Sequence, residues 1–380
     1  MTDPAPLPPL AGLKIIDFST LLPGPLASLI LAEAGATVVK IERPEGEDLR
    51  RYPGAFNGDS AAFVLLNRLK TSLCIDLKHM DAFARLQPYL ETADVLIEQF
   101  RPGVMERLGF GWGRLRALNP RLIYCSITGY GSKSPRRDVA GHDLNYAALT
   151  GVLDGGRGGD GVPALPPVLA ADIAGGAYPA VMNILLTLRQ RDATGAGCHL
   201  DIAMADNMFT FAYGGLADGF ATGHWPRPGA ELLSGGSPRY QIYPTADGRF
   251  LAAAPIEDRF WVIFCDAIGL PAAERDDSAD PGRVIARVKS IIAAETTDTW
   301  RARFAGRDVC VEIVATMEEA ARDPAFARLF THNIVADGRS LPALPVPVAP
   351  SLRQPNPAAG YARLGNADIG NLWQRESDHD

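Results

Sequence analysis

The sequence lacks the patterns that mark several classes of protein. Its five cysteines are scattered and form no Cys-x-x-Cys pair, which argues against a zinc site and against the disulfide framework of a small secreted chain. No run approaches the roughly 20 uninterrupted apolar residues of a membrane span. The N-terminus does not resemble a signal peptide, and the C-terminus is not a Ser-Lys-Leu address. We therefore expect a cytoplasmic protein with no metal site and no membrane partner.

The charge balance excludes a further class. The formal net charge is −7 at pH 7, whereas a nucleic-acid-binding protein needs a basic face. A small anionic ligand held by a few arginines remains compatible with this balance. The 47% hydrophobic and 21% charged residues are typical of a globular chain, and 380 residues suffice for two domains.

Short apolar runs alternate with helical patterns in the first third of the chain. The patterns predict strands over residues 13–18, 36–42, 72–77, 94–100 and 122–128, and helices over residues 26–34 and 81–92. Such alternation predicts a Rossmann-like α/β sheet with parallel strands. The first turn is Leu-Leu-Pro-Gly-Pro and lacks the Gly-x-Gly-x-x-Gly fingerprint, so we do not expect NAD binding.

The sequence pattern is different in the rest of the chain. We expect helices over 175–189 and 201–213, a Gly/Pro-rich linker over 214–239, a hairpin over 240–254 followed by helices to about 330, and an extended proline-rich segment over 342–357. This pattern predicts a large Rossmann-like domain of residues 1–213, completed by residues 331–380. Residues 240–330 then form a smaller α/β domain.

Three ionisable residues stand out as candidates for chemistry. His142 lies in Gly-His-Asp-Leu-Asn-Tyr, and Asp172 follows 30 positions later in Ala-Asp-Ile-Ala-Gly-Gly. An imidazole titrates near neutrality, and neighbouring glycines let a carboxylate approach a substrate closely. Glu257 follows a strand-like run and starts a predicted helix, where a favourable interaction with the helix dipole explains it equally well.

Several stretches, taken in order, resemble the family III CoA transferases, and within them the α-methylacyl-CoA racemases. The matching stretches are LKIIDFSTLLPGPLA, VVKIERPEG, ADVLIEQFRPGVMERLG, LIYCSITGYG, GHDLNYAALTGVL, ADIAGG and TADGRFLAAAPIEDRFW. They extend from about residue 10 to about residue 330, most of the chain. The resemblance implies a large Rossmann-like domain, a smaller α/β domain and an interlocked homodimer.

Fewer residues carry the resemblance to the racemases in particular. Many transferases have tyrosine where His142 stands, and Glu257 falls in an Ile-Glu motif typical of racemases. The Ser234–Pro238 stretch is similar to the racemase loop, and the glycine-richer loop of several transferases is absent. The chain departs from the racemases after the glutamate, where it has Asp258 and Arg259 in place of Pro and Gln.

The resemblance implies a reaction at the carbon next to a thioester, whose proton is acidic because an enolate can form. His142 and Asp172 would act as two bases, one for each enantiomer, with Glu257 orienting His142 and the N-terminus of the helix after Asp172 stabilising the enolate. The alternative is a CoA transferase, in which Asp172 would be the nucleophile. The third alternative is a CoA-binding protein without catalysis.

Coenzyme A would enter as part of the substrate, so we expect no tightly bound cofactor. Its phosphates need cations, for which the candidates are Arg43, Lys70, Arg101 and Arg107. Leu22, Pro23 and Phe100 are candidates for apolar contact, and Gln99 completes the predicted CoA-binding set. Ligands of open α/β sheets bind at the carboxyl ends of the strands, where these residues are expected.

Overall fold

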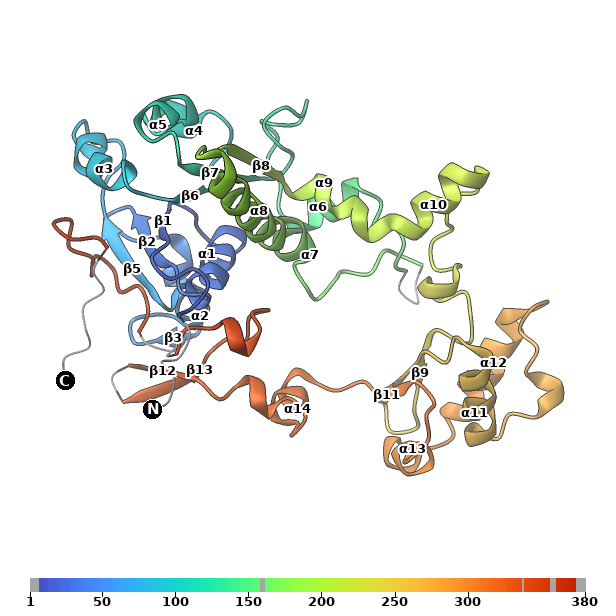
Figure 1. The fold of residues 1–380 in the computed structure, drawn as a ribbon. Coiled ribbons are helices and arrows are strands. Elements are labelled where there is room, and N and C mark those ends of the chain that lie inside the picture. The colour runs from blue at the N-terminus through green and yellow to red at the C-terminus, as the bar shows by residue number, and fades with distance from the viewer. Residues whose placement is uncertain (1–6, 158–160, 337, 356–359, 374–380) are drawn as a thin grey trace. The chain divides into compact units, whose positions relative to one another are not determined.

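The computed structural model describes residues 7–157, 161–336, 338–355 and 360–373 (Figure 1). The chain divides into two compact units. The large unit comprises Met1–Thr150, Val168–Thr210 and Ala327–Asp380, and the small unit comprises Gly151–Pro167 and Phe211–Phe326.

A six-stranded parallel sheet organises the large unit. Its strands are β1 (Lys14–Asp17), β2 (Thr37–Glu42), β5 (Lys70–Cys74), β6 (Val95–Glu98), β7 (Ile123–Thr128) and β8 (His199–Ala203). They lie in the order β5-β2-β1-β6-β7-β8, and every neighbouring pair is parallel. Numbered along the chain within this sheet, the order is 3-2-1-4-5-6, as in Rossmann folds. The predicted α/β fold class is confirmed.

Helices cover both faces of this sheet (Figure 1). On one face α1 (Pro23–Glu33) packs against α8 (Tyr178–Thr194) and the strands. On the other face, α3 (Ala82–Leu90), α4 (Val104–Arg107) and α5 (Trp112–Leu118) enclose a core with strand residues such as Ile16 and Leu96. Because side chains alternate along a strand, the neighbours of these core residues face α1 and α8. A strand buried on both faces explains the continuous apolar runs of the sequence.

The remaining elements of the large unit are short. They are η1 (Asp48–Arg51), the hairpin β3 (Ala55–Phe56) and β4 (Asp59–Ser60), α2 (Ala61–Asn67), α6 (Asp143–Leu149), α7 (Ala170–Asp172), the π-helical turn η2 (Ile173–Ala177), α9 (Met204–Met208), η6 (Ala327–Leu329), the hairpin β12 (Asn333–Ala336) and β13 (Arg339–Pro342), and η7 (Pro350–Leu352). Helix α9 contacts α6, α7 and η2, α7 contacts both α6 and η2, and η2 also contacts strands β7 and β8.

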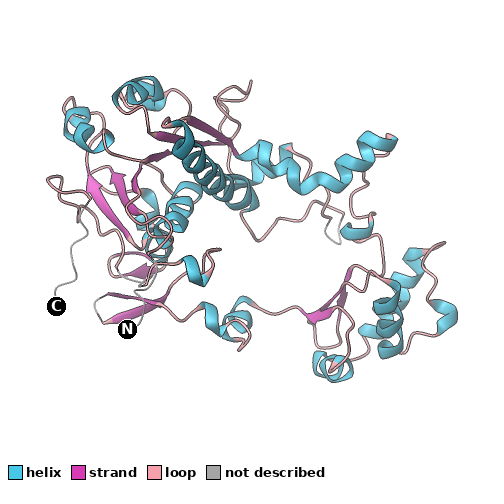
Figure 2. Cartoon of the chain, in the orientation of Figure 1, coloured by secondary structure: helices cyan, strands magenta, loops and turns pink. Residues whose placement is uncertain are grey.

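The small unit has its own sheet and core. Its antiparallel strands β9 (Gln241–Pro244), β10 (Phe250–Ala253) and β11 (Val311–Ile313) lie in the order β11-β10-β9, which confirms the predicted hairpin. Its helical segments are α10 (Tyr213–Thr222), η4 (Leu232–Ser234), α11 (Asp258–Ile268), η5 (Ala272–Glu274), α12 (Pro281–Ile292), α13 (Thr297–Phe304) and α14 (Met317–Arg322) (Figure 2). Trp261, Phe264 and Trp300 lie in its core.

Three predicted elements differ from the structure. The helix expected over 201–213 begins instead as the edge strand β8, whose outward residues are too polar to show an apolar run. The linker expected over 214–239 starts with helix α10, and η3 (Phe209–Ala212) precedes it. The strand expected over 72–77 lies two residues earlier, so that Lys70 is inside β5 instead of on a loop.

Among the residues that the structure describes, one helical segment, Ala170–Thr194, is long and apolar enough to cross a membrane by length and composition. It comprises α7, η2 and α8, and it contacts α1, β7 and β8. Packing on the central sheet accounts for the buried apolar residues of this segment, such as Val181 and Ile184, because a helix that covers a buried sheet needs such a face.

Candidate active site

A pocket of about 300 Å³ lies in the large unit where its central strands end. The pocket, which we call the sheet-edge pocket, is lined from the segments after four strands: Leu21 and Pro23 after β1, residues 99–102 after β6, residues 127–130 around the end of β7, and Met204 after β8. Strand order reverses between β1 and β6, and ligands of open α/β sheets bind at such switch points. The fold therefore places this pocket where a ligand is expected.

His142 and Asp172 both line the sheet-edge pocket. His142 is the exposed residue before helix α6, and the side chain of Asn145 accepts the hydrogen bond of its backbone N–H at 3.0 Å. Asp172 ends the short helix α7, where the chain passes into the π-helical turn η2. The two residues that the sequence singled out are thus brought to one pocket from different helices.

The carboxyl group of Asp172 is electrostatically unusual. Its pKa is raised to about 6: partial burial is the largest cause, the negative charge of Asp143 also raises the pKa, and the nearby His142 lowers it. A carboxyl group with a pKa near neutrality can both accept and return a proton at physiological pH. Such perturbed groups are enriched at functional sites.

Asp143 is a site residue that the sequence reasoning missed. It is buried, and its carboxylate accepts the backbone N–H of Asp172 at 3.0 Å. This bond ties the start of helix α6 to the end of helix α7, and so fixes His142 and Asp172 relative to each other. The signal in the sequence was its position beside His142, but nothing local indicates its partner 29 residues away.

Two glycines let the helix after Asp172 pack closely. A Cβ on Gly175 would lie 2.7 Å from the carbonyl oxygen of Met204, and one on Gly176 would lie 3.1 Å from the Cβ of Pro23. The carbonyl of Gly175 accepts a hydrogen bond from Asn207 at 2.7 Å. The Gly-Gly pair thus seats the segment of Asp172 against the loop after β1.

The expected enolate donor is not free. We predicted that N–H groups at the start of a helix after Asp172 would point to the ligand. The helical backbone instead begins at Ala170, so the N–H of Asp172 is bound to Asp143 and that of Ile173 to the carbonyl of Leu169. That part of the prediction is wrong.

Glu257 belongs to the small unit. It is exposed and precedes helix α11, and its backbone carbonyl accepts the N–H groups of Phe260 and Trp261. The neighbouring Asp258 forms an ion pair with Arg239 at 2.6 Å. The orienting role of Glu257 toward His142 stays a prediction.

The predicted CoA-binding residues are only partly brought together. Pro23, Gln99, Phe100 and Arg101 line the sheet-edge pocket, whereas Leu22 precedes helix α1 outside the lining. Arg43 follows strand β2 and is engaged by Asp48 at 2.5 Å and by the carbonyl of Gly46 at 2.8 Å.

A group of arginines lies beside the pocket. Arg101 and Arg137 line it, and the guanidinium groups of Arg107 and Arg137 both come within 4.0 Å of the position that a Cβ on Gly103 would take. Among the described residues, no ion pair of Arg101 or Arg107 is present, and Arg137 pairs with Asp138 at 3.7 Å. Three guanidinium groups with one such carboxylate leave positive charge for an anionic ligand. Sequence reasoning missed Arg137, which is distant from the others along the chain.

Lys70 is not available as a phosphate ligand. Its Nζ donates to the carbonyl of Pro25 at 2.8 Å and to the side chain of Asn67 at 2.9 Å, and it lies 3.5 Å from Asp17. The side chain is completely buried, and burial lowers its pKa to about 7 despite the carboxylate of Asp17. The prediction that Lys70 contacts CoA is wrong, because its ammonium group holds helix α1 to the sheet.

Comparison with known proteins gives a consistent family. The profile of CoA-transferase family III matches residues 10–362. An α-methylacyl-CoA racemase of Mus musculus is 35% identical over 346 residues, which cover 88% of this chain and 84% of the relative. A succinate–glutarate CoA-transferase of Agrobacterium fabrum is 32% identical over 385 residues, 95% of each chain. The solved structure of a CaiB/BaiF family protein from Brucella suis matches with a TM-score of 0.81 at 28% identity, covering 95% of this chain and 97% of that one.

Proposed function

Because this chain belongs to CoA-transferase family III, we propose that it is an α-methylacyl-CoA racemase. It inverts the α-carbon of a 2-methylacyl-CoA thioester by removing the α-proton from one face and delivering a proton to the opposite face. The observation that carries this proposal is the presence of His142 and Asp172 in one pocket, with the pKa of Asp172 raised to about 6.

The reaction needs two bases and an electron sink. One base takes the α-proton, the electron pair of the broken C–H bond moves onto the thioester carbonyl, and an enolate forms. The other base, protonated at the start, then gives its proton to the opposite face of the α-carbon. His142 and Asp172 exchange these roles between the two enantiomers, since an imidazole and a carboxyl group of raised pKa both transfer protons near neutrality.

Asp143 supports this assignment through its interactions with Asp172. Its carboxylate holds the backbone of Asp172, and its charge contributes to the raised pKa of that residue. We assign Asp143 as a positioning residue. Glu257, from the small unit, would orient the imidazole of His142 and fix its tautomer.

The coenzyme A part of the substrate binds through its charge and its apolar portions. Arg101, Arg107 and Arg137 supply guanidinium groups for the phosphates, with Arg43 as an additional cation. Pro23 and Phe100 offer apolar contacts in the sheet-edge pocket. No resident cofactor is needed, because the thioester itself makes the α-proton acidic.

A CoA transferase is the second candidate. Transferases occur among the relatives at similar identity, for example an acetyl-CoA:oxalate CoA-transferase of Acetobacter aceti. In that reaction the carboxylate of Asp172 attacks the thioester carbonyl and CoA thiolate leaves, giving a mixed anhydride. The thiolate then attacks the aspartyl carbonyl, releasing the first carboxylate and leaving an aspartyl-CoA thioester for the acceptor acid.

One experiment separates the two reactions. One enantiomer of a 2-methylacyl-CoA is incubated with the protein in deuterated water, with and without a free carboxylic acid. A racemase incorporates deuterium at the α-carbon and produces the other enantiomer without the acid. Transfer of CoA to the acid with no deuterium at the α-carbon would establish the transferase instead.

We further propose that the protein is a cytoplasmic homodimer, interlocked as the family resemblance implies. Helix α8 supports a covering partner, because Tyr178, Met182, Leu185 and Leu186 are exposed at spacings of three and four residues. Sedimentation equilibrium tests this assembly, and a mass of one chain at micromolar concentration would exclude it.

A further inference from the structure

The loop after strand β1, residues 19–23, forms one wall of the sheet-edge pocket through Leu21 and Pro23. We propose that Glu47 and Gln99 are positioning residues that hold this loop in the shape that receives the CoA ester. The proposal rests on the function proposed above, since the ligand is taken from it. It assigns to Gln99 a role other than the direct CoA contact that the sequence suggested.

Side chains hold four polar backbone groups of the loop. Ser19 donates its N–H to Asp17 at 2.8 Å, and its carbonyl accepts from the ammonium group of Lys40 at 2.7 Å. The carbonyl of Thr20 accepts from Gln99 at 2.9 Å. The N–H of Leu21 is bound by Glu47 at 2.8 Å. A loop held from three neighbouring segments has little freedom before a ligand arrives, which favours binding.

Leu21 is the strained point of this loop. Its φ is +63°, a left-handed conformation that a residue with a Cβ rarely adopts. The carboxylate of Glu47 accepts the N–H of Leu21 in this conformation, so it stabilises the geometry that the backbone alone disfavours.

Glu47 is held as a buried charge. Its side chain is 2% exposed and its second oxygen lies 3.4 Å from the ammonium group of Lys40, which is itself fully buried. Lys40 therefore neutralises Glu47 and, at the same time, binds the carbonyl of Ser19. The Lys40–Glu47 ion pair thus fixes two backbone groups of the loop, the carbonyl of Ser19 and the N–H of Leu21.

Gln99 joins the loop to the start of helix α1. Its amide nitrogen donates to the carbonyl of Thr20, and its amide oxygen accepts the N–H of Gly24 at 3.0 Å. Both ends of this side chain are therefore used inside the protein. Gly24 has to be glycine for this contact, because a Cβ there would lie 2.1 Å from the Cβ of Ser19.

The loop also backs the segment that carries Asp172. Pro23 lies against Gly176, four residues after Asp172, at the close approach described above. A loop that moves would shift both the wall formed by Leu21 and the support of the catalytic carboxyl group. Glu47 and Gln99 thus influence the site through the position of this loop.

The test measures binding of coenzyme A to the full chain by titration calorimetry. Glu47→Leu removes the acceptor for Leu21, Glu47→Gln keeps an acceptor without the charge, and Gln99→Leu removes both bonds of the amide without leaving a buried charge unpaired. Glu45→Gln is the matched control, because Glu45 is an exposed carboxylate two residues from Glu47. Amide hydrogen exchange of the peptide that contains Leu21 is measured in parallel.

We expect the Kd for coenzyme A to rise roughly tenfold in Glu47→Leu and in Gln99→Leu, at an unchanged number of sites per chain. Exchange of the Leu21 peptide should accelerate in Glu47→Leu, and Glu47→Gln and Glu45→Gln should stay within about twofold of the unaltered Kd. Loss of folded protein alone would instead reduce the number of sites at unchanged Kd. If Glu47→Leu does not fold, the Kd of Gln99→Leu for coenzyme A decides whether the loop has this positioning role.

One result would overturn the positioning role of Glu47 and Gln99, and another would overturn the proposed function. An unchanged Kd in Gln99→Leu, together with an unchanged Kd in any folded Glu47→Leu, would overturn the positioning role and leave the proposed function standing. An unaltered protein that binds no coenzyme A would overturn the proposed function itself, and only the exchange data would then bear on the loop.

Discussion

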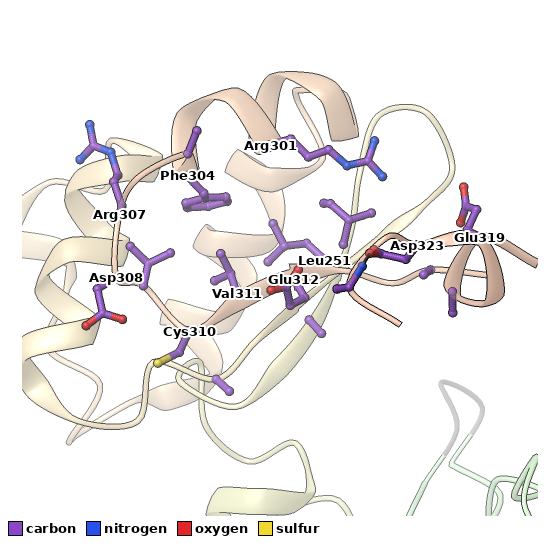
Figure 3. A pocket seen from close by; sticks show the side chains of 18 of the residues that line it. Leu251, Arg301, Phe304, Arg307, Asp308, Cys310, Val311, Glu312, Glu319 and Asp323 are labelled. Atoms are coloured by element: carbon purple, nitrogen blue, oxygen red, sulfur yellow. Dashed lines mark hydrogen bonds between the residues drawn. The ribbon is translucent and has the colours of Figure 1, made fainter. Parts of the chain in front are cut away.

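Two hollows of the molecule differ in a way that bears on function. The sheet-edge pocket of the large unit measures about 300 Å³, whereas a hollow in the small unit measures about 1140 Å³. The larger one, which we call the small-unit pocket, is lined by residues of β10, α13, β11 and α14 and of the segments beside them, several of which are charged (Figure 3). The smaller one gathers residues from the ends of four strands. Convergence of chemical groups, and not volume, distinguishes the candidate site.

The charged groups of the two hollows are used differently. In the small-unit pocket Arg301 pairs with Asp298, and Glu319 pairs with Arg249 and caps helix α14, so that these groups stabilise the surface of the fold. In the sheet-edge pocket, partial burial raises the pKa of Asp172. A carboxyl group whose charged form is disfavoured is available for chemistry, whereas one held in an ion pair is not.

The largest difference between the two hollows should appear in catalysis. His142→Ala and Asp172→Asn should each lower racemisation of a 2-methylacyl-CoA by at least roughly a hundredfold, because one of two proton transfers loses its base. Cys310→Ser, in the small-unit pocket, should leave the rate within about twofold. Optical rotation or chiral separation of the product measures the rate. A comparable loss in Cys310→Ser would move the catalytic assignment away from the sheet edge.

Substitutions in the two pockets should also differ in their effect on the Kd for coenzyme A, by a smaller factor than in their effect on the racemisation rate. Arg101→Ala and Arg137→Ala should each raise the Kd roughly tenfold, since each removes a charge-assisted hydrogen bond to phosphate. Arg307→Ala, which removes an arginine of the small-unit pocket, is the control and should leave the Kd unchanged. Arg43→Ala should have a smaller effect than Arg101→Ala, because Asp48 already engages Arg43. Calorimetry at fixed salt measures all four, and an effect confined to Arg307→Ala would contradict the proposed phosphate site.

The pH dependence should show the smallest of these effects. Asp172 acts as a base only when ionised, so exchange in that direction should fall as the pH drops through about 6, the raised pKa of its carboxyl group. Asp143→Asn keeps an oxygen to accept the N–H of Asp172 but removes a charge that raises this pKa. The acid limb of the profile should therefore move to lower pH. An acid limb that does not move would show that Asp143 acts through the hydrogen bond alone.

The sequence predicted the central sheet because its strands are buried on both faces. Continuous apolar runs such as those of β1 and β7 are visible without any knowledge of their neighbours. The edge strand β8 was missed, because His199 and Asp201 interrupt its apolar run. Local pattern thus reveals a strand with a continuous apolar run better than one whose run polar residues interrupt.

The candidate site was predicted only as far as local motifs reach. His142 and Asp172 stand in recognisable stretches, and the structure brings them to one pocket. Asp143 and Glu47 were missed because the residues they bind are distant along the chain, and Arg137 was missed because the other arginines of its group are distant. Lys70 was misplaced because a cation paired inside the fold looks the same in a sequence as an exposed one. Long-range contacts are set by the packing of the whole unit, which short patterns do not contain.

Proton exchange of each enantiomer in the two base variants tests the central claim most directly. Each enantiomer of a 2-methylacyl-CoA is incubated in deuterated water with His142→Ala and with Asp172→Asn, and NMR follows the α-proton. We predict that each variant exchanges one enantiomer without inverting it, and that the two variants prefer opposite enantiomers, because the remaining base serves one face only. Equal loss of exchange for both enantiomers in both variants, or CoA transfer that survives in His142→Ala but not in Asp172→Asn, would contradict the two-base racemase.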